Sequence, residues 1–304
     1  MRPRVVIMTC VAALVGVVVL TVPTTRAALA SLGAHSKAVA AFSDVPPSPP
    51  PPSAQIAAQP APPVPTLRAP ADPGAIHPAG NPSFSGWAFL DRRTGAVVGS
   101  ANSGSGTNTA ESMIKAWIAG DYLRTHNPST SALNDLTLMI IDSNDGMAEK
   151  YYEMDGRNAV VQRLISMCGL SHTTIYPFYW ARTTMTPQDA VKYGNCVANG
   201  TAAGPKWTDW LLDTMRHVRG GVNDQISTAK QGGRWGIIDG LPPEIAAGTS
   251  IKNGFTGYVD GWHVNCLAIQ QDWVLNVMVR IGTLQAAANV CRSVAQQLVV
   301  TPQL

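Results

Sequence analysis

The order of strand-like and helix-like segments constrains the fold of this chain more than any other feature. Apolar and polar residues alternate, as in strands, near residues 86–101 and again over residues 248–281. The segments between these regions carry apolar residues at helical spacing, and so do residues 285–299. Strands from both chain ends are most simply joined in one sheet, which the inserted helices and the final helix cover. The sequence therefore predicts an α/β domain of the α+β type.

Individual elements can be placed by residue number. Residues 86–90 and 96–101 flank Asp91-Arg92-Arg93-Thr94-Gly95, a turn sequence that predicts a hairpin. Thr109 and Glu111 are expected to cap the first helix. Further strands are expected at residues 248–254, 262–270 and 273–281. Helices are expected at residues 113–124, 145–152, 159–167, 186–195, 207–218 and 285–299.

The N-terminus has the pattern of an export signal. Met1-Arg2-Pro3-Arg4 is followed by an apolar run over residues 5–22, and Ala28-Leu29-Ala30 offers a small-residue cleavage site. The apolar run is long for a signal peptide and just short of a comfortable membrane span, so an uncleaved anchor is the alternative. We expect residues 1–30 to be a signal peptide or membrane anchor. The domain is then secreted, in the cell wall or membrane-anchored, outside the cytoplasm.

A proline-rich segment follows the export signal. Of the 23 prolines in the chain, 14 lie between residues 46 and 82, mixed with Ala, Ser and Gln. Such a sequence lacks amide donors and apolar periodicity, which predicts an extended, solvated tether. Residues 31–82 are therefore expected to be a disordered linker, and residues 83–304 to form a single catalytic domain.

Charge and cysteine content limit the partners. The formal net charge is only +3 and no basic cluster is present, so we expect no nucleic-acid partner, and a membrane partner only through the N-terminal segment. Apart from Cys10, the four cysteines of an exported chain permit two disulfides, and sequence proximity favours Cys168 with Cys196 and Cys266 with Cys291. Other pairings and free thiols remain the alternatives. No Cys/His zinc pattern occurs, so we expect no metal. We also expect no cofactor, and we expect the protein to be a monomer.

Ser112 and Lys115 are a candidate nucleophile and base. They lie three residues apart at the start of a strongly apolar helix, so they share one face of it. A serine hydroxyl becomes a good nucleophile when a neighbouring amine, its pKa lowered by burial, takes the proton. Helix N-terminal N–H groups also stabilise an oxyanion. A second Ser-x-x-Lys, Ser227 to Lys230, lacks such a helix, and the plainer alternative for Ser112 is a helix cap beside a solvated Lys.

Two later segments complete a pattern. Asp142-Ser143-Asn144-Asp145 precedes a predicted helix, and Ser250-Ile251-Lys252-Asn253-Gly254 lies on a predicted strand. A strand Lys can neutralise a substrate carboxylate, and Gly lets the substrate backbone approach closely.

In this order the three segments resemble the Ser-x-x-Lys, Ser-x-Asn and Lys-Thr-Gly elements of the penicillin-recognising serine hydrolases. The chain is similar in particular to small exported actinobacterial serine hydrolases of the β-lactamase superfamily, from about Gly86 to the C-terminus. Arg182-Thr183-Thr184-Met185-Thr186-Pro187 also resembles the end of the omega loop of class A β-lactamases. The resemblance implies a five-stranded antiparallel sheet flanked by helices, an all-helical lobe, and an active site between them, as in the β-lactamases and DD-peptidases.

The resemblance also implies residue roles. Ser112 is the nucleophile, Lys115 its base and Ser143 the proton shuttle to the leaving group. Lys252 binds a substrate carboxylate, and the amide N–H of Phe255 is the second oxyanion donor. The implied substrate-binding residues are Asp145, Lys252, Asn253, Gly254 and Phe255.

Asp145 departs from this pattern because the family has Asn at its position. An ionised Asp accepts hydrogen bonds but donates none to an acyl-amide carbonyl. It can instead pair with Lys115, which keeps the amine charged and makes it a poorer base. The alternative is that Ser143 and Asp145 cap the following helix.

The second departure concerns deacylation. Class A β-lactamases hydrolyse the acyl-enzyme with an omega-loop Glu, but residues 157–188 contain no Asp or Glu, and Thr183 replaces the acid of the related motif. We therefore expect poor β-lactam turnover.

The sequence predicts an exported serine acyl hydrolase or acyltransferase that forms an acyl-enzyme at Ser112. Its expected substrates are cell-wall peptide stems, β-lactams or related amides and esters. The alternative is a catalytically weakened peptidoglycan-binding module that retains the fold.

Overall fold

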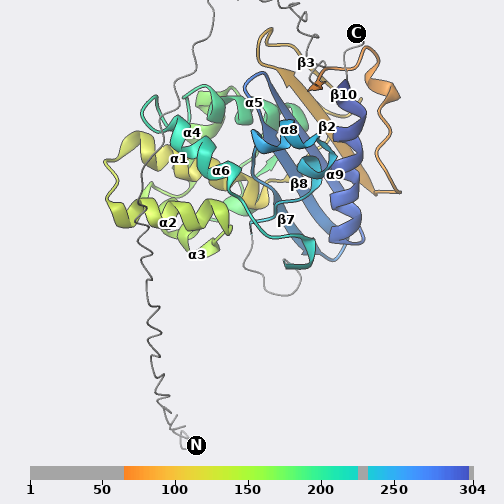
Figure 1. Cartoon of the computed structure of the whole chain (residues 1–304). Coiled ribbons are helices and arrows are strands. Elements are labelled where there is room, and N and C mark those ends of the chain that lie inside the picture. The colour runs from red at the N-terminus through yellow and green to blue at the C-terminus, as the bar shows by residue number, and fades with distance from the viewer. Residues whose placement is uncertain (1–64, 225–231, 301–304) are drawn as a thin grey trace, which may run out of the picture. The chain divides into compact units, whose positions relative to one another are not determined.

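The computed structural model describes residues 65–224 and 232–300 of the chain. Its main sheet is antiparallel, in the order β3-β2-β9-β8, with β6 and β7 sharing the outer edge of β8. Figure 1 shows the gold strands from the start of the domain beside the blue strands from its end. The strands are β2 (Phe84–Asp91), β3 (Val97–Gly99), β6 (Ser250–Ile251), β7 (Gly254–Tyr258), β8 (Gly261–Ile269) and β9 (Trp273–Ile281).

The sheet has five strand positions, because β6 and β7 follow one another along a single edge. The predicted five-stranded antiparallel sheet is thus confirmed. The break between β6 and β7 falls at Lys252 and Asn253, although the Lys252 N–H still donates to the Leu267 carbonyl of β8 at 3.1 Å. The predicted hairpin between β2 and β3 is also confirmed.

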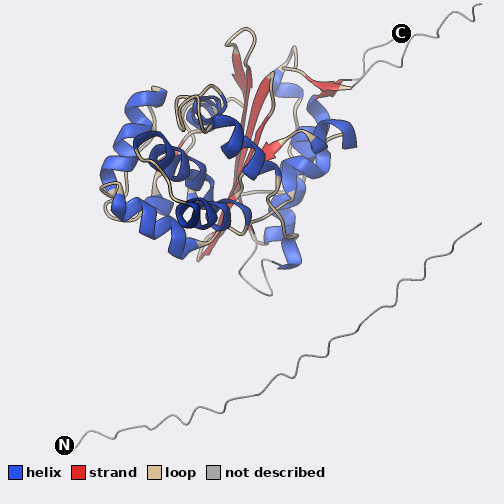
Figure 2. Cartoon of the chain, turned by 60° about the vertical axis from the view of Figure 1, so that its left-hand side comes forward, coloured by secondary structure: helices blue, strands red, loops and turns tan. Residues whose placement is uncertain are grey.

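Helices cover both faces of the sheet. Helix α9 (Leu284–Leu298) packs on one face, where Cys291 forms a disulfide with Cys266 of β8. Helix α5 (Pro187–Ala198) packs on the other, where a Cβ on Gly194 would lie 3.1 Å from Leu267. Neighbouring residues of a strand point to opposite faces, so Cys266 and Leu267 identify the two layers. Figure 2 shows the sheet between its two helical layers.

A helical lobe packs against α5 on the side away from the sheet. Its central helix α1 is buried from Lys115 through Leu123 and contacts the other helices of the lobe. The predictions at residues 113–124, 145–152, 159–167 and 207–218 correspond to four of these helices, whereas α2 was not predicted. A disulfide between Cys168 and Cys196 ties α4 to α5. The lobe contains α1 (Lys115–Thr125), α2 (Thr130–Ile141), α3 (Asp145–Met154), α4 (Asn158–Cys168) and α6 (Thr208–Arg216).

The folded unit begins earlier than the predicted boundary at residue 83. Strand β1 (Thr66–Leu67) pairs with β10 (Val299–Val300), and the side chains of Leu67 and Ile76 are buried. The His77 N–H donates to Gln297 of α9 at 2.9 Å. We call residues 66–79 the N-terminal strap. The prediction of a disordered linker is wrong for this part, because two apolar side chains and a strand pairing fix it to the domain.

The predicted linker before residue 65 and the predicted signal or anchor lie outside the described residues. Among the residues that the structure does describe, no helix is both long and apolar enough to span a membrane.

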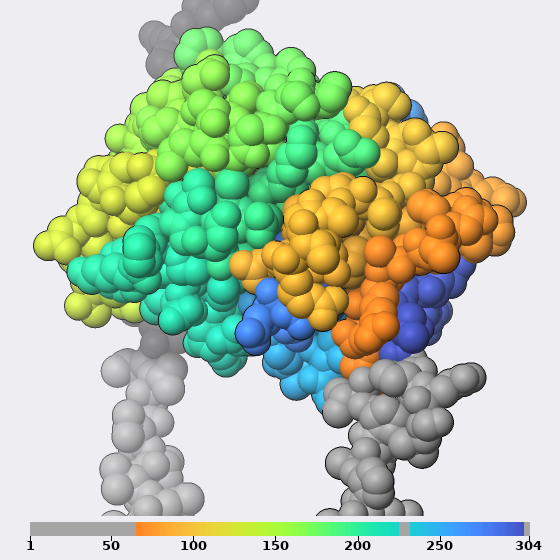
Figure 3. Space-filling model, turned by 90° about the horizontal axis from the view of Figure 1, so that it is seen from above, coloured from red at the N-terminus to blue at the C-terminus, as the bar shows by residue number. Residues whose placement is uncertain are grey.

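The space-filling view shows orange, gold, green, teal and blue segments meeting on one surface, so chain regions far apart in sequence build the domain together (Figure 3).

Candidate active site

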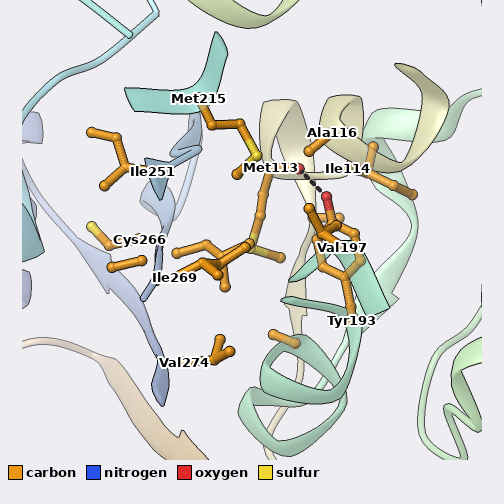
Figure 4. Packing of buried hydrophobic residues seen from close by; sticks show 14 of the residues in the cluster. Met113, Ile114, Ala116, Tyr193, Val197, Met215, Ile251, Cys266, Ile269 and Val274 are labelled. Carbon is orange, nitrogen blue, oxygen red and sulfur yellow. Dashed lines mark hydrogen bonds between the residues drawn. The ribbon is translucent and has the colours of Figure 1, made fainter. Parts of the chain in front are cut away.

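Ser112 lies in η2 (Glu111–Ile114), a short 3-10 turn that leads into α1. The predicted side-chain caps of Thr109 and Glu111 are wrong, because neither η2 nor α1 has a side-chain cap. Glu111 adopts a φ of 50°, a conformation that non-glycine residues rarely take and that often marks functional sites. The segment is held by an Ala110 N–H bond to the Thr183 carbonyl at 2.6 Å. It is also held by the Tyr193 hydroxyl, which donates to the Met113 carbonyl at 2.8 Å (Figure 4).

Gly254 lets β7 pass directly against η2. A Cβ at this position would lie 2.4 Å from the Ala110 carbonyl oxygen and 2.9 Å from the Ser112 nitrogen. Such distances are too short for any side chain, so only Gly fits. The backbone that lies against Gly254 is the η2 segment of the protein itself, and the predicted approach of a substrate backbone stays a prediction.

The Lys115 amine is buried and does not contact the Ser112 hydroxyl. It donates to Asp145 at 2.5 Å and to the backbone carbonyl and side-chain hydroxyl of Ser143 at 2.5 and 3.0 Å. Within the described ranges, the Ser112 hydroxyl has no hydrogen-bond partner. Burial lowers the pKa of Lys115, and the charges of Asp145 and Glu111 oppose that shift. The amine is thus biased toward the neutral form that a base requires, but its present partner is Asp145.

Ser143 lies between two amines. Lys252 donates to the Ser143 hydroxyl at 3.0 Å, the same distance as Lys115. Because a hydroxyl has two acceptor lone pairs, both are occupied and its own proton remains available to a third group. Ser143 also has a positive φ of 54°. These contacts suit the predicted shuttle role, since the hydroxyl can donate outward while the amines stabilise its oxygen.

Lys252 is fully buried, with no solvent-exposed surface. Burial and the neighbouring charge of Lys115 lower the pKa of Lys252 well below its usual range. Its Nζ donates to the Ser143 hydroxyl and does not line the Ser112 cavity, so the predicted binding of a substrate carboxylate stays a prediction.

Asn144 caps α3. Its side-chain oxygen accepts from the Met147 N–H at 3.0 Å, so the helix cap is neither Ser143 nor Asp145. The alternative that Ser143 and Asp145 only cap the helix is therefore wrong. Asp145 is free to contact Lys115, and its side chain is 82% exposed.

A cavity of about 350 Å³ contains Ser112 and is bounded by both the sheet and the helical lobe. Asp145 on α3, Phe255 on β7 and Trp180 of η3 (Trp180–Arg182) line it. Its charged lining residues are all acidic, because neither Lys115 nor Lys252 reaches its surface. The lining comprises Glu111, Ser112, Asp145, Gly146, Glu149, Tyr179, Trp180, Ala181, Phe255 and Thr256.

Asn253 has a structural role in the described contacts. Its amide donates to the carbonyls of Gly233 and Trp235 at 2.9 and 2.8 Å, and the side chain is buried. It therefore holds the 233–235 segment and is absent from the cavity lining. Phe255 does line the cavity, while the oxyanion role of its N–H stays a prediction.

Two carboxylates of the cavity were not singled out as functional from the sequence. Glu111 accepts from Thr256 at 2.6 Å and from the Tyr258 hydroxyl at 2.7 Å. Glu149 accepts from the Trp180 indole at 3.0 Å. A signal for Glu149 exists in the sequence, since it follows Asp145 by four residues and so shares its helix face.

The sheet and the helical lobe, with the Ser112 cavity at their junction, define the fold class of the domain. The domain has the β-lactamase-like fold of class A β-lactamases and penicillin-binding proteins. The structure titled PBP-A has a TM-score of 0.51 and 18% identity, covering 72% of this chain and 91% of that one. A class A β-lactamase from Mycobacterium abscessus has a TM-score of 0.53 and 14% identity, covering 71% and 92%.

A sequence relative is the protein named "Putative lipoprotein LppW" of Mycobacterium tuberculosis, which is 29% identical over 177 residues. The match covers 55% of this chain and 52% of the relative, so the chain spans about half the length of that protein. A protein of the same name in Mycobacterium bovis matches equally. No protein-family model matches the chain.

Proposed function

We propose that this protein is an exported serine acyl hydrolase or acyltransferase that forms an acyl-enzyme at Ser112. The observation that carries the proposal is the cavity in which Ser112 is exposed to ligand, beside a buried pair of lysines that share the Ser143 hydroxyl. The proposed substrates are small amides, esters or lactams, or cell-wall peptide stems, and the proposed active form is a monomer.

In the proposed acylation, the Ser112 oxygen attacks the acyl carbonyl carbon. Its proton passes to the Lys115 amine once that amine leaves Asp145, and the Ser143 hydroxyl gives a proton to the leaving group. Lys115 replaces that proton through Ser143, so the amine returns to its neutral form. The depressed pKa of Lys115 supports this role, because a base must be neutral near working pH.

Export is supported by two observations. The two disulfides are stable in oxidising compartments and rare in the cytosol. The mycobacterial relative is named a lipoprotein, which is a class of exported protein.

Active-site labelling tests the proposal. The purified domain is incubated with a fluorophosphonate or penicillin G, and its intact mass is measured over time. We expect one adduct per chain on the wild type, and β-lactam adducts that persist because class A-type turnover is poor. Ser112→Ala should abolish the adduct, whereas Ser227→Ala, in the other Ser-x-x-Lys, should leave it intact. Wild-type protein that takes up neither probe would exclude the acyl-enzyme proposal.

The second candidate is a weakened module that binds peptidoglycan without turnover. It is favoured by the 2.5 Å contact between Lys115 and Asp145, which occupies the amine that would activate Ser112. This candidate predicts sedimentation with purified cell walls, undiminished by Ser112→Ala, together with the absence of any covalent adduct.

A further inference from the structure

Hydrolysis of an acyl-enzyme needs a base that can take a proton from water beside the Ser112 ester. Among the described residues that line the Ser112 cavity, Glu111, Asp145 and Glu149 carry carboxylates. The three differ in how their oxygens are already used, and that difference selects one of them.

The carboxylates of Asp145 and Glu111 already accept hydrogen bonds from other residues of the protein. One oxygen of Asp145 accepts a hydrogen bond from the Lys115 amine at 2.5 Å, so this carboxylate is occupied by the candidate acylation base. Each oxygen of Glu111 accepts a hydrogen bond, one from Thr256 and one from Tyr258, and its side chain is buried. Neither oxygen of Glu111 is therefore left without a hydrogen-bond donor.

In the described part of the chain, the carboxylate of Glu149 is held by a hydrogen bond to only one of its two oxygens. Its Oε2 accepts from the Trp180 indole at 3.0 Å, while Oε1 has no hydrogen-bond partner within residues 65–224 and 232–300. Trp180 is itself buried, so it fixes the position of the carboxylate. The Lys115 amine lies 5.2 Å from the centroid of the same indole ring. The Glu149 carboxylate and the candidate acylation base are therefore both neighbours of Trp180.

We propose that Glu149 is the general base that hydrolyses the acyl-enzyme, an inference that rests on the proposed function. The water oxygen bonds to the acyl carbonyl carbon as one water proton passes to Glu149. The tetrahedral intermediate then collapses, the bond between carbon and the Ser112 oxygen breaks, and the proton on Glu149 returns to that oxygen. The products are a free carboxylic acid and the resting enzyme. Helix α3 thus supplies the acid that residues 157–188 lack.

The test separates acylation from deacylation with p-nitrophenyl acetate as the probe. Release of nitrophenol reports acylation, and intact mass reports the acetyl-enzyme. Glu149→Gln should keep the burst of nitrophenol but slow decay of the acetyl-enzyme by about 100-fold or more, since positioned acid–base groups contribute that much. The pH profile of the residual decay should lose its acidic limb. A purely structural role would leave the shape of that profile unchanged.

The matched control is Glu153→Gln, which lies one turn further along α3 and pairs with Arg157 on the surface. It should leave decay unchanged. Trp180→Phe keeps the Glu149 carboxylate but removes its hydrogen bond, so decay should slow to a smaller extent. Equal decay rates in the wild type and Glu149→Gln would overturn the proposal. Should Glu149→Gln fail to fold, unchanged decay in Trp180→Phe would overturn it instead. Absence of an acetyl adduct on wild-type Ser112 would overturn the proposed function itself.

Discussion

Lys115 shows how single contacts set the chemistry of this site. Burial favours its neutral amine, while the contact with Asp145 favours the charged form. In the proposed mechanism, activation of Ser112 therefore depends on how easily the amine leaves Asp145. The exposed Asp145 side chain makes that exchange feasible, because water and substrate can both compete for the carboxylate.

Removal of the Asp145 charge should make Lys115 a better base at low pH. Asp145→Asn eliminates the interaction that raises the pKa of Lys115, so that pKa falls. The neutral amine then persists to lower pH, and the acidic limb of the Ser112 labelling rate should move down by about one pH unit. Labelling rates measured from pH 5 to 10 check this, with the surface variant Asp213→Asn as control. A limb that stays in place or moves up contradicts the assignment.

The sequence identified several residues of the site and left others out. Ser112, Lys115, Ser143 and Lys252 belong to short motifs whose spacing is visible in the chain. Glu149 belongs to no such motif, and its hydrogen-bond partner Trp180 lies in η3, which is distant in the sequence. The spacing of four residues from Asp145 places Glu149 on the same helix face, but it does not show that Trp180 would bind one of its oxygens.

At the scale of elements, the contact between β7 and η2 holds the segment that carries Ser112. Both edges of the contact are backbone, because Gly254 has no side chain to separate them. The η2 turn that carries Ser112 is thus held on the edge strand of the sheet, and its position should be sensitive to a single methyl group.

Gly254→Ala should lower the free energy of unfolding by about 2 kcal/mol or more, since the new Cβ would overlap the η2 backbone. Labelling of Ser112 should slow as well. Gly257→Ala is the matched control on the same strand, because its Cβ would lie 3.5 Å from Trp262, an ordinary contact. Urea denaturation followed by circular dichroism measures both variants. Equal midpoints for the two would show that η2 can shift without cost.

Most regular elements were predictable because their apolar spacing is strong. Helix α9 and strands β8 and β9 appear within a residue or so of the predicted bounds. Helix α2 was missed, although Ser129 caps it with an acceptor for the Ala132 N–H at 3.2 Å. The break between β6 and β7 was also missed, and it falls next to Gly254, which packs against the distant segment η2.

At the scale of the whole molecule, both ends of the described chain meet. The N-terminal strap pairs with β10 and lies along α9, so the final helix is covered by the residues that precede β2. The proline content of this segment predicts a disordered linker, because composition averages over the whole segment and does not reveal two buried side chains. Leu67 and Ile76 are the residues that carry the strap into the core.

The strap should therefore contribute to stability. A protein that starts at Ser83 loses the burial of Leu67 and Ile76, and each buried aliphatic side chain contributes about 2 kcal/mol. It should unfold at a lower urea concentration than a protein that starts at Gln59, and α9 should exchange its amide hydrogens faster. The double variant Leu67→Ala with Ile76→Ala, made in the longer protein, should reproduce most of this loss. Urea midpoints and hydrogen exchange measure it. Identical midpoints for the two lengths would mean that the strap lies on the domain without stabilising it, and the folded unit would then begin at β2.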